Sequence, residues 1–285
     1  MKAVEANEID TFSATFVVVF HLAAIAGILW TGVNLFFLSI ALVSYVVRIW
    51  AMSTGYHRYF SHRAFRTSRF FQFLLAVAGT LTIERGPLWW AAHHRHHHRC
   101  ADQEDDIHSP TVQGYFWAYV GWMHCKKYSA ATDYTRIKDF SRYPELLWID
   151  RYYVVPPLVA SVLIWVLAGP AVFVWAVLVG TIIQWHALFG SNILCHLLGR
   201  RRFDTPDTSR NNAVSAVLLL GEGWHNNHHY YPGSARQGFY WWEVDLIYYS
   251  IKLLEKCHLV WDVREVPEDV LLRGRYQAAV GSAAQ

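Results

Sequence analysis

The chain has 285 residues, of which 54% are hydrophobic and 16% aromatic, and its formal net charge is +3. This is too apolar for an ordinary soluble domain, while the 16% of charged residues requires polar segments as well. Nothing in this charge balance indicates a nucleic-acid partner. Because the sequence contains no repeat and no low-complexity linker, we expect one domain over residues 1–285.

Four apolar runs approach the ~20 residues that a membrane-spanning helix needs. They occupy approximately residues 12–30, 35–53, 153–167 and 172–188. A fifth run, residues 70–83, is shorter and is flanked by charged residues, so we expect an interfacial or re-entrant helix there. The sequence therefore predicts an all-α integral membrane protein with four transmembrane helices.

The short links inside each pair of runs, residues 31–34 and 168–171, contain neither Lys nor Arg. Because positive residues favour the cytoplasmic side, both links are predicted to be external and both termini internal. Residues 54–152 and 189–270 would then form a helical cytoplasmic cap. We expect residues 271–285 to be a disordered tail.

Histidines at regular spacings in the predicted cap and at its edges are typical of metal binding. They form one HxxxxH pattern, two HxxHH patterns and one isolated position, namely His57 and His62; His94, His97 and His98; His225, His228 and His229; and His196. HxxHH places its imidazoles on one helix face. Five residues turn an α-helix by roughly 500°, however, so the HxxxxH pair cannot face one metal from an undistorted helix.

Nine imidazoles are too many for one tetrahedral zinc ion and about right for two metal ions. Nitrogen ligands suit zinc, copper or iron, and we favour two irons because a redox metal best explains so large a site beside a membrane. Zinc could occupy the same site in purified protein. Asn192 is four residues before His196 and is predicted to support the site by a hydrogen bond or through a water. His93 and His96 would point away from the 94/97/98 face, and no catalytic group is expected beyond the metal ligands.

The three histidine patterns, in this order, resemble those of the membrane fatty acid desaturases, specifically of the stearoyl-CoA (Δ9) type. The matching segments are His57-Arg-Tyr-Phe-Ser-His62, His94-Arg-His-His97-His98, Asn192-Ile-Leu-Cys-His196 and His225-Asn-Asn-His228-His229. The resemblance extends from about Arg48 to Pro232. The segment from Trp89 to His98 is most similar to bacterial members, which implies a place in a bacterial inner membrane with the active site on the cytoplasmic side.

The resemblance implies a non-heme diiron enzyme that uses O2 and two electrons to introduce a cis double bond into a saturated fatty acyl chain. The electrons would come from a separate protein, a ferredoxin or a cytochrome b5, because no fused cytochrome b5 domain is visible.

The acyl carrier is less well defined by the resemblance. In animal acyl-CoA enzymes a basic pair after a Val-Gly-Trp element meets the CoA phosphates, and Lys126 and Lys127 have the matching offset here. Arg85 stands near a third contact position, whereas Ala92-His93 replaces an Arg-Asp pair. The carrier is therefore left open between CoA, acyl-carrier protein and a phospholipid.

Two other functions are compatible with parts of the pattern. A hydroxylase or acetylenase would use the same site on a similar chain. A membrane metal transporter or storage protein would place ligands inside the spans, whereas the histidine patterns here lie outside them.

Overall fold

The computed structural model describes residues 8–129 and 132–283. The first half contains α1 (Thr11–Thr31), α2 (Leu35–Ala51), η1 (Met52–Ser61), α3 (Arg69–Thr80), α4 (Pro87–Cys100), α5 (Tyr115–Tyr119), η2 (Gly121–His124), α6 (Lys126–Ser129), η3 (Tyr134–Arg136) and α7 (Lys138–Ser141). The second half contains α8 (Pro144–Arg151), α9 (Val155–Ala168), α10 (Pro170–Phe173), η4 (Val174–Val179), α11 (Gly180–Leu197), α12 (Ala213–Leu218), α13 (His225–Tyr230), α14 (Leu246–Lys256) and α15 (Glu268–Ala283). Two short strands, β1 (Arg66–Thr67) and β2 (Val260–Trp261), pair antiparallel.

Three continuous helices are long and apolar enough to cross a membrane: Thr11–Thr31, Leu35–Ser61 and Pro170–Leu197. The helices α8 and α9 make a fourth candidate only as a pair, because they bend by 66° where they meet. The structure thus has three candidate spans, or four, as expected, if the bent pair forms one span. The run at 70–83 forms the short helix α3, as its length predicted.

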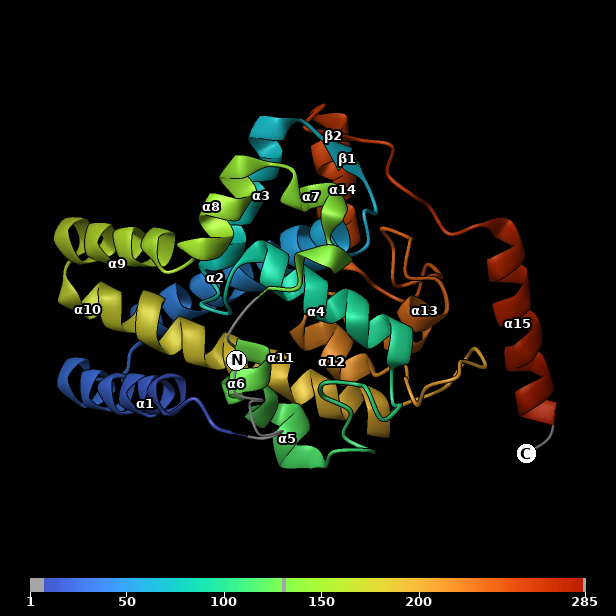
Figure 1. Ribbon diagram of the computed structural model, residues 1–285, viewed down its shortest axis with the longest axis horizontal. Coiled ribbons are helices and arrows are strands. Elements are labelled where there is room, and N and C mark those ends of the chain that lie inside the picture. Colours follow the sequence, from blue (N-terminus) through green and yellow to red (C-terminus); the bar gives the residue numbers. More distant parts are fainter. Residues whose placement is uncertain (1–7, 130–131, 284–285) are drawn as a thin grey trace.

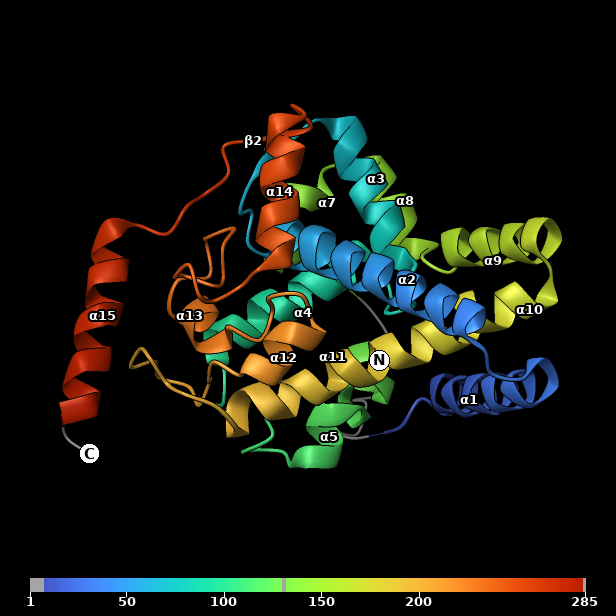
Figure 2. The same ribbon diagram turned by 180° about the vertical axis from the view of Figure 1, so that it is seen from behind.

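The apolar helices and the histidine-bearing helices occupy different ends of the molecule. In Figure 1, α1, α9 and α10 extend to the left, whereas α4, α12 and α13 lie to the right of them. Figure 2 shows from behind that α2 and α11 run from the apolar end into the other end. Side chains on the projecting helices are exposed even when large and apolar, such as Phe12 at 82% and Leu29 at 81%. Such a surface fits contact with lipid.

Two of the long helices contain π-helical segments, η1 in the second and η4 in the third. A π-turn leaves its backbone groups imperfectly paired, which is costly inside a membrane. At η4, the carbonyl of Ala176 accepts hydrogen bonds from Ser44 Oγ (2.5 Å) and from Arg48 Nη2 (3.4 Å). The buried Arg48 in the second run thus supports the neighbouring span.

The chain beyond residue 271 differs from the expected disordered tail, because α15 continues to Ala283. Val270 is buried in a cluster with Phe203 and Tyr240. Gly274 lies so close to the same cluster that an added Cβ would come within 2.5 Å of Tyr240 Oη. The polar composition of this segment gave no sign of the aromatic cluster that holds its first turn. Residues 284–285 lie outside the described residues.

Candidate metal centre

The nine histidines of the spaced patterns come together in two groups. They project from η1 and the residue after it, from α4, from the end of α11 and from α13. One group contains His57, His62, His94, His98 and His228, and the other contains His97, His196, His225 and His229. Within each group, one ring nitrogen of every residue lies within 4.8 Å of the others. Each group could therefore hold one metal ion.

The π-helix η1 explains how His57 and His62 reach the same group. A π-helix bonds residue i to residue i+5, and the backbone N–H of His62 donates to the carbonyl of His57 at 3.2 Å. The two rings consequently lie one turn apart in an edge-to-face arrangement, with centroids 4.9 Å from each other. The α-helix is thus distorted here into a wider turn, which aligns residues five apart.

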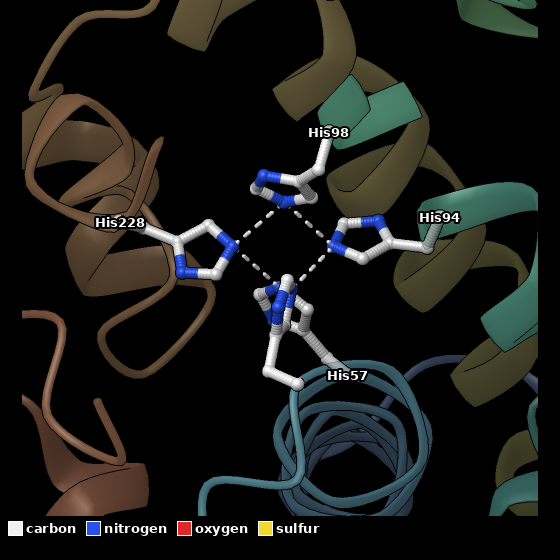
Figure 3. A group of neighbouring side chains, drawn as sticks. His57, His94, His98 and His228 are labelled. Carbon is white, nitrogen blue, oxygen red and sulfur yellow. Dashed lines mark hydrogen bonds between the residues drawn. The ribbon is translucent and has the colours of Figure 1, made fainter. Parts of the chain in front are cut away.

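Each HxxHH triplet is divided between the two groups rather than kept within one. In α4, His94 and His98 join the first group, while His97 joins the second. In α13 only His228 belongs to the first group. Figure 3 shows the first group, in which the Nε2 atoms of His98 and His228 are 3.0 Å apart. Because both helices serve both groups, the two candidate metal sites must be close neighbours.

Three aspartates hold histidines of the second group by the opposite ring nitrogen. The Nδ1 atoms donate to carboxylates in the pairs His97–Asp106 (3.0 Å), His196–Asp102 (3.0 Å) and His229–Asp207 (2.9 Å). A carboxylate can only accept here, so Nδ1 carries the proton and Nε2 keeps its lone pair. These pairs fix the tautomer that binds a metal.

Glu222 plays the same part for the first group. Its carboxylate pairs with Nδ1 of His57 and also accepts two hydrogen bonds from Arg58, at 3.1 and 2.8 Å. The flanking glycines allow this placement: Gly221 has a φ of +129°, and a Cβ on Gly223 would come within 2.0 Å of the backbone nitrogen of Ala216. The Gly-Glu-Gly sequence before the third pattern therefore allows the carboxylate of Glu222 to pack against His57.

Burial keeps six of the nine imidazoles neutral. It holds the pKa well below its usual value, with neighbouring imidazoles adding to the effect, at His62, His94, His98, His225 and His228. Burial also lowers the pKa of His229 to about 4, although Asp207 opposes it. At Asp207 burial acts to raise the pKa, but the hydrogen bond and charge of His229 outweigh it and the pKa falls well below the usual value. Neutral imidazoles and ionised carboxylates are the states that metal binding requires.

A buried nitrogen without a hydrogen-bond partner shows whether a metal ion fits the second group. Nε2 of His229 is buried and has no hydrogen-bond partner, while its Nδ1 is held by Asp207. An unpaired buried lone pair costs free energy unless something binds it. A metal ion among the four nitrogens of the second group would satisfy it. The donor set therefore fits a nitrogen-ligated transition metal.

Comparison with known proteins agrees with this geometry. Residues 28–258 match the fatty acid desaturase family. The chain belongs to the fatty acid desaturase family. Relatives include an acyl-CoA 5-desaturase of Anemone leveillei, 32% identical over 266 residues, which cover 93% of this chain and 82% of the relative. An sn-1 stearoyl-lipid 9-desaturase of Anabaena variabilis is 30% identical over 260 residues, covering 90% of this chain and 94% of the relative. The chain is thus a fatty acyl desaturase, and a transporter or storage function is not supported.

The desaturase has an apolar cavity against both histidine groups. The cavity has a volume of about 100 Å³ and is lined by His57 and His94 of the first group and by His196 of the second. Its other walls are mostly apolar, with Trp90, Met52, Ile107, Trp122, Met123, Leu188, Phe189 and Leu219 among them. Trp90 stacks on His94 with ring centroids 4.7 Å apart. The apolar lining would place an apolar ligand next to the histidines.

Asn192, His93 and His108 line this cavity, whereas His96 does not. Asn192 lines it, but its amide donates to the carbonyl of Ala118 at 3.2 Å and it is in neither histidine group. His93 and His96 bond to backbone carbonyls instead of joining a group. His108, in contrast, forms a group with His97 and Asp106, in which one possible ligand atom of each residue lies within 4.8 Å of the others.

The three headgroup candidates have different surroundings. Lys127 lines a polar cavity that shares His93 and Ile107 with the apolar one. Lys126 forms an ion pair with Glu8 instead. Arg85 donates to the carbonyl of Ser129 at 3.0 Å and covers the ring of Trp89. Of the three, Lys127 is therefore placed best to meet a ligand.

The residues that sequence reasoning missed are the four carboxylates and Arg58. Glu222 had a signal, because it stands between two glycines directly before a histidine pattern. Asp102 and Asp106 lie in an acidic stretch just after the second pattern. Such a stretch is usually a solvated surface, and only the fold shows that two of its members turn inward.

Proposed function

We propose that this desaturase uses O2 to introduce a cis double bond, at a Δ9-like position, into a saturated fatty acyl chain. The observation that carries the proposal is the shared wall: both histidine groups face one apolar cavity. An acyl chain in that cavity would present a C–H bond to the site while its remaining carbons contact apolar side chains.

The nine histidines would hold two iron ions, five around one and four around the other. Bound iron would supply the oxygen-activating redox chemistry. The residues of the chain supply the rest: Asp102, Asp106, Asp207 and Glu222 orient the imidazoles, and the apolar side chains of the cavity contact the acyl chain. Zinc would also fit nitrogen ligands, so zinc in purified protein would not by itself contradict iron in the working enzyme.

The test is the product formed by the iron-loaded protein. Purified full-length protein would receive saturated acyl substrates, O2 and a reduced ferredoxin or cytochrome b5, and the products would be analysed by gas chromatography with mass spectrometry. We expect a new cis alkene that requires iron and is absent with the zinc-loaded protein. A hydroxylated or alkynyl product without an alkene would identify the hydroxylase or acetylenase alternative and refute the proposal.

The position of the double bond and the carrier are part of the same test. The relatives are named as 5- and 9-desaturases of acyl-CoA or of lipids. The Δ9-like position rests on the resemblance of the histidine patterns. For the carrier, we propose that the polar cavity with Lys127 binds the headgroup, with Arg85 beside it. Acyl-CoA, acyl-carrier-protein and phospholipid substrates of one chain length would separate the carriers, and Lys127→Ala should raise KM without changing the double-bond position.

We also propose a multi-pass topology in which both termini and the site face the cytoplasm, and an electron donor that is a separate protein. The support is the absence of Lys and Arg from the two links at residues 31–34 and 168–171. Cysteines introduced singly at Gly32 and Gly169 should react with a membrane-impermeant maleimide in intact cells. Labelling that occurs only after lysis would show the opposite orientation, with both links on the cytoplasmic side.

A further inference from the structure

A buried carboxylic acid lies in the wall of the apolar cavity, outside both histidine groups. Glu84 is 4% exposed and stands in the loop between α3 and α4. It lines the cavity together with His57 and His94. It accepts a hydrogen bond of 2.5 Å from Nε2 of Gln184 on α11. Binding of an acyl chain does not explain this carboxyl, because burying a carboxyl beside an apolar ligand is unfavourable.

Burial raises the pKa of Glu84 to about 8, and hydrogen bonds from Gln184 and Trp90 only partly offset this. Unlike the carboxylates beneath the histidines, Glu84 has no cationic partner among the described residues. The carboxyl therefore carries a proton at neutral pH and can release it to a suitable acceptor.

Three ionisable groups on the segments around this loop are engaged elsewhere. Tyr56 from η1 donates to the carbonyl of Arg85 at 3.0 Å. The guanidinium of Arg85 is directed to the carbonyl of Ser129. Asp150 from α8 accepts the two backbone N–H groups at the start of α4. None of them supplies a counter-charge that would keep Glu84 ionised.

Further polar atoms without partners accompany Glu84. Oε1 of Gln184, Oγ of Ser53 and Nε1 of Trp122 are buried and make no hydrogen bond. Ser53 and Trp122 line the same cavity as Glu84. Buried polar atoms of this kind are normally satisfied by internal water. The cavity wall thus offers positions for water beside the carboxyl, which apolar packing alone would not require.

The proposed reaction consumes protons at a buried site. One CH2–CH2 unit, one O2, two electrons from the redox protein and two protons give one CH=CH unit and two waters. Two C–H bonds and the O–O bond break, and four O–H bonds form, with two of the four hydrogens arriving as protons. The lone pairs at Nε2 of the histidines would be taken by metal, so another group must bring these protons in.

We propose that Glu84 is a proton carrier for the reduction of oxygen, passing protons through water held near Gln184 and Ser53. The inference rests on the proposed desaturase function and adds a residue to it. Glu84 acts on the reaction through water and shapes no bond of the acyl chain directly.

The test compares the iron-loaded wild type with Glu84→Gln. Glutamine keeps the shape and can still accept from Gln184, but it cannot carry a proton. We expect substrate KM and iron content to be unchanged and alkene turnover at pH 7 to fall by roughly 10²-fold, the usual contribution of a positioned acid. Less alkene should form per O2 consumed, with hydrogen peroxide as the balance. Added formic acid should restore part of the turnover, and Glu268→Gln, an exposed site on α15, should behave as wild type.

The pH profile gives a second measurement. Wild-type turnover should decline as the pH rises through about 8, because the carrier loses its proton there. Gln184→Leu removes a hydrogen bond that lowers the pKa of Glu84, so in this variant the decline in turnover should move to higher pH. This second variant tests the inference independently if Glu84→Gln does not fold. The inference is refuted if Glu84→Gln keeps wild-type turnover and coupling, if it only shifts the double-bond position, or if the decline in Gln184→Leu does not move. If the wild type makes alkene, these outcomes leave the desaturase proposal standing.

Discussion

Replacement of Asp207 by asparagine should weaken metal binding at the four-histidine group selectively. One oxygen of Asp207 accepts from Nδ1 of His229 at 2.9 Å. The other accepts from the backbone N–H of Ser209 and from the hydroxyl of Thr205, each at 2.9 Å. Asparagine has only one acceptor, so it can satisfy either His229 or Ser209 but must turn its amide N–H2 towards the other donor.

The size of the effect follows from this loss. Removing a carboxylate that orients a histidine ligand typically costs 10–100-fold in metal affinity, which is about 1.4–2.7 kcal/mol. Because Asp207 is buried and its partner His229 has an otherwise unpaired Nε2, we expect the upper part of that range. The five-histidine group contacts a different carboxylate, Glu222, and should keep its metal.

The assay is metal retention against a graded series of chelator concentrations, with bound iron counted by mass spectrometry. Wild type should retain two irons per chain until both dissociate, whereas Asp207→Asn should lose one at a chelator concentration 10–100-fold lower. Asp204→Asn is the matched control, because Asp204 is three residues away and its side chain is 94% exposed. If Asp207→Asn holds both irons as tightly as wild type, the carboxylate does not set the affinity and the ligand assignment of His229 is wrong.

Three further outcomes follow from the same geometry. His98→Ala should abolish alkene formation while the protein still inserts into membranes, and His96→Ala, on the same helix but outside both groups, should retain activity in the same gas-chromatographic assay. In the metal-free protein, the lowered pKa of His229 contributes all of its stabilisation above about pH 6.5, the pKa of histidine in the unfolded chain, and this stabilisation is lost as the pH falls towards about 4. Thermal unfolding between pH 7 and 4 measures the loss, and a constant unfolding temperature would contradict it. Asp150→Ala removes the acceptor for the N–H groups of Leu88 and Trp89 and should lower the free energy of unfolding by about 1–3 kcal/mol, visible as an earlier urea midpoint; an unchanged midpoint would show that water replaces the cap.

The apolar helices could be predicted from the sequence because membrane spanning is a property of local composition. The runs at 12–30 and 35–53 match α1 and α2 closely. The last run was placed too short, since the helix continues to Leu197 through a stretch that contains Gln184, Asn192 and His196. These polar residues face the interior of the protein, and composition does not show which side of a helix is buried.

The histidine set could also be predicted, although its arrangement could not. The spacing identified nine residues, and all nine fall in the two groups. The expectation that His57 and His62 cannot face one metal from an undistorted helix assumed α-helical geometry. The segment η1 is a π-helix instead, and this brings the two side chains into the same group. A π-helix is favoured by tertiary contacts rather than by a residue pattern, so no local signal announced it.

The sequence by itself determined that apolar helices accompany a histidine-rich candidate metal site, because hydrophobic run length and histidine spacing are local properties of the chain. Only the tertiary structure decided that α4 and α13 each divide their histidines between two groups, and that Asp102, Asp106, Asp207 and Glu222 fix the tautomers. The physical reason is that the ring nitrogens of each group come together only where η1, α4, α11 and α13 pack against one another. That crossing depends on packing between segments up to 171 residues apart, as for His57 and His228.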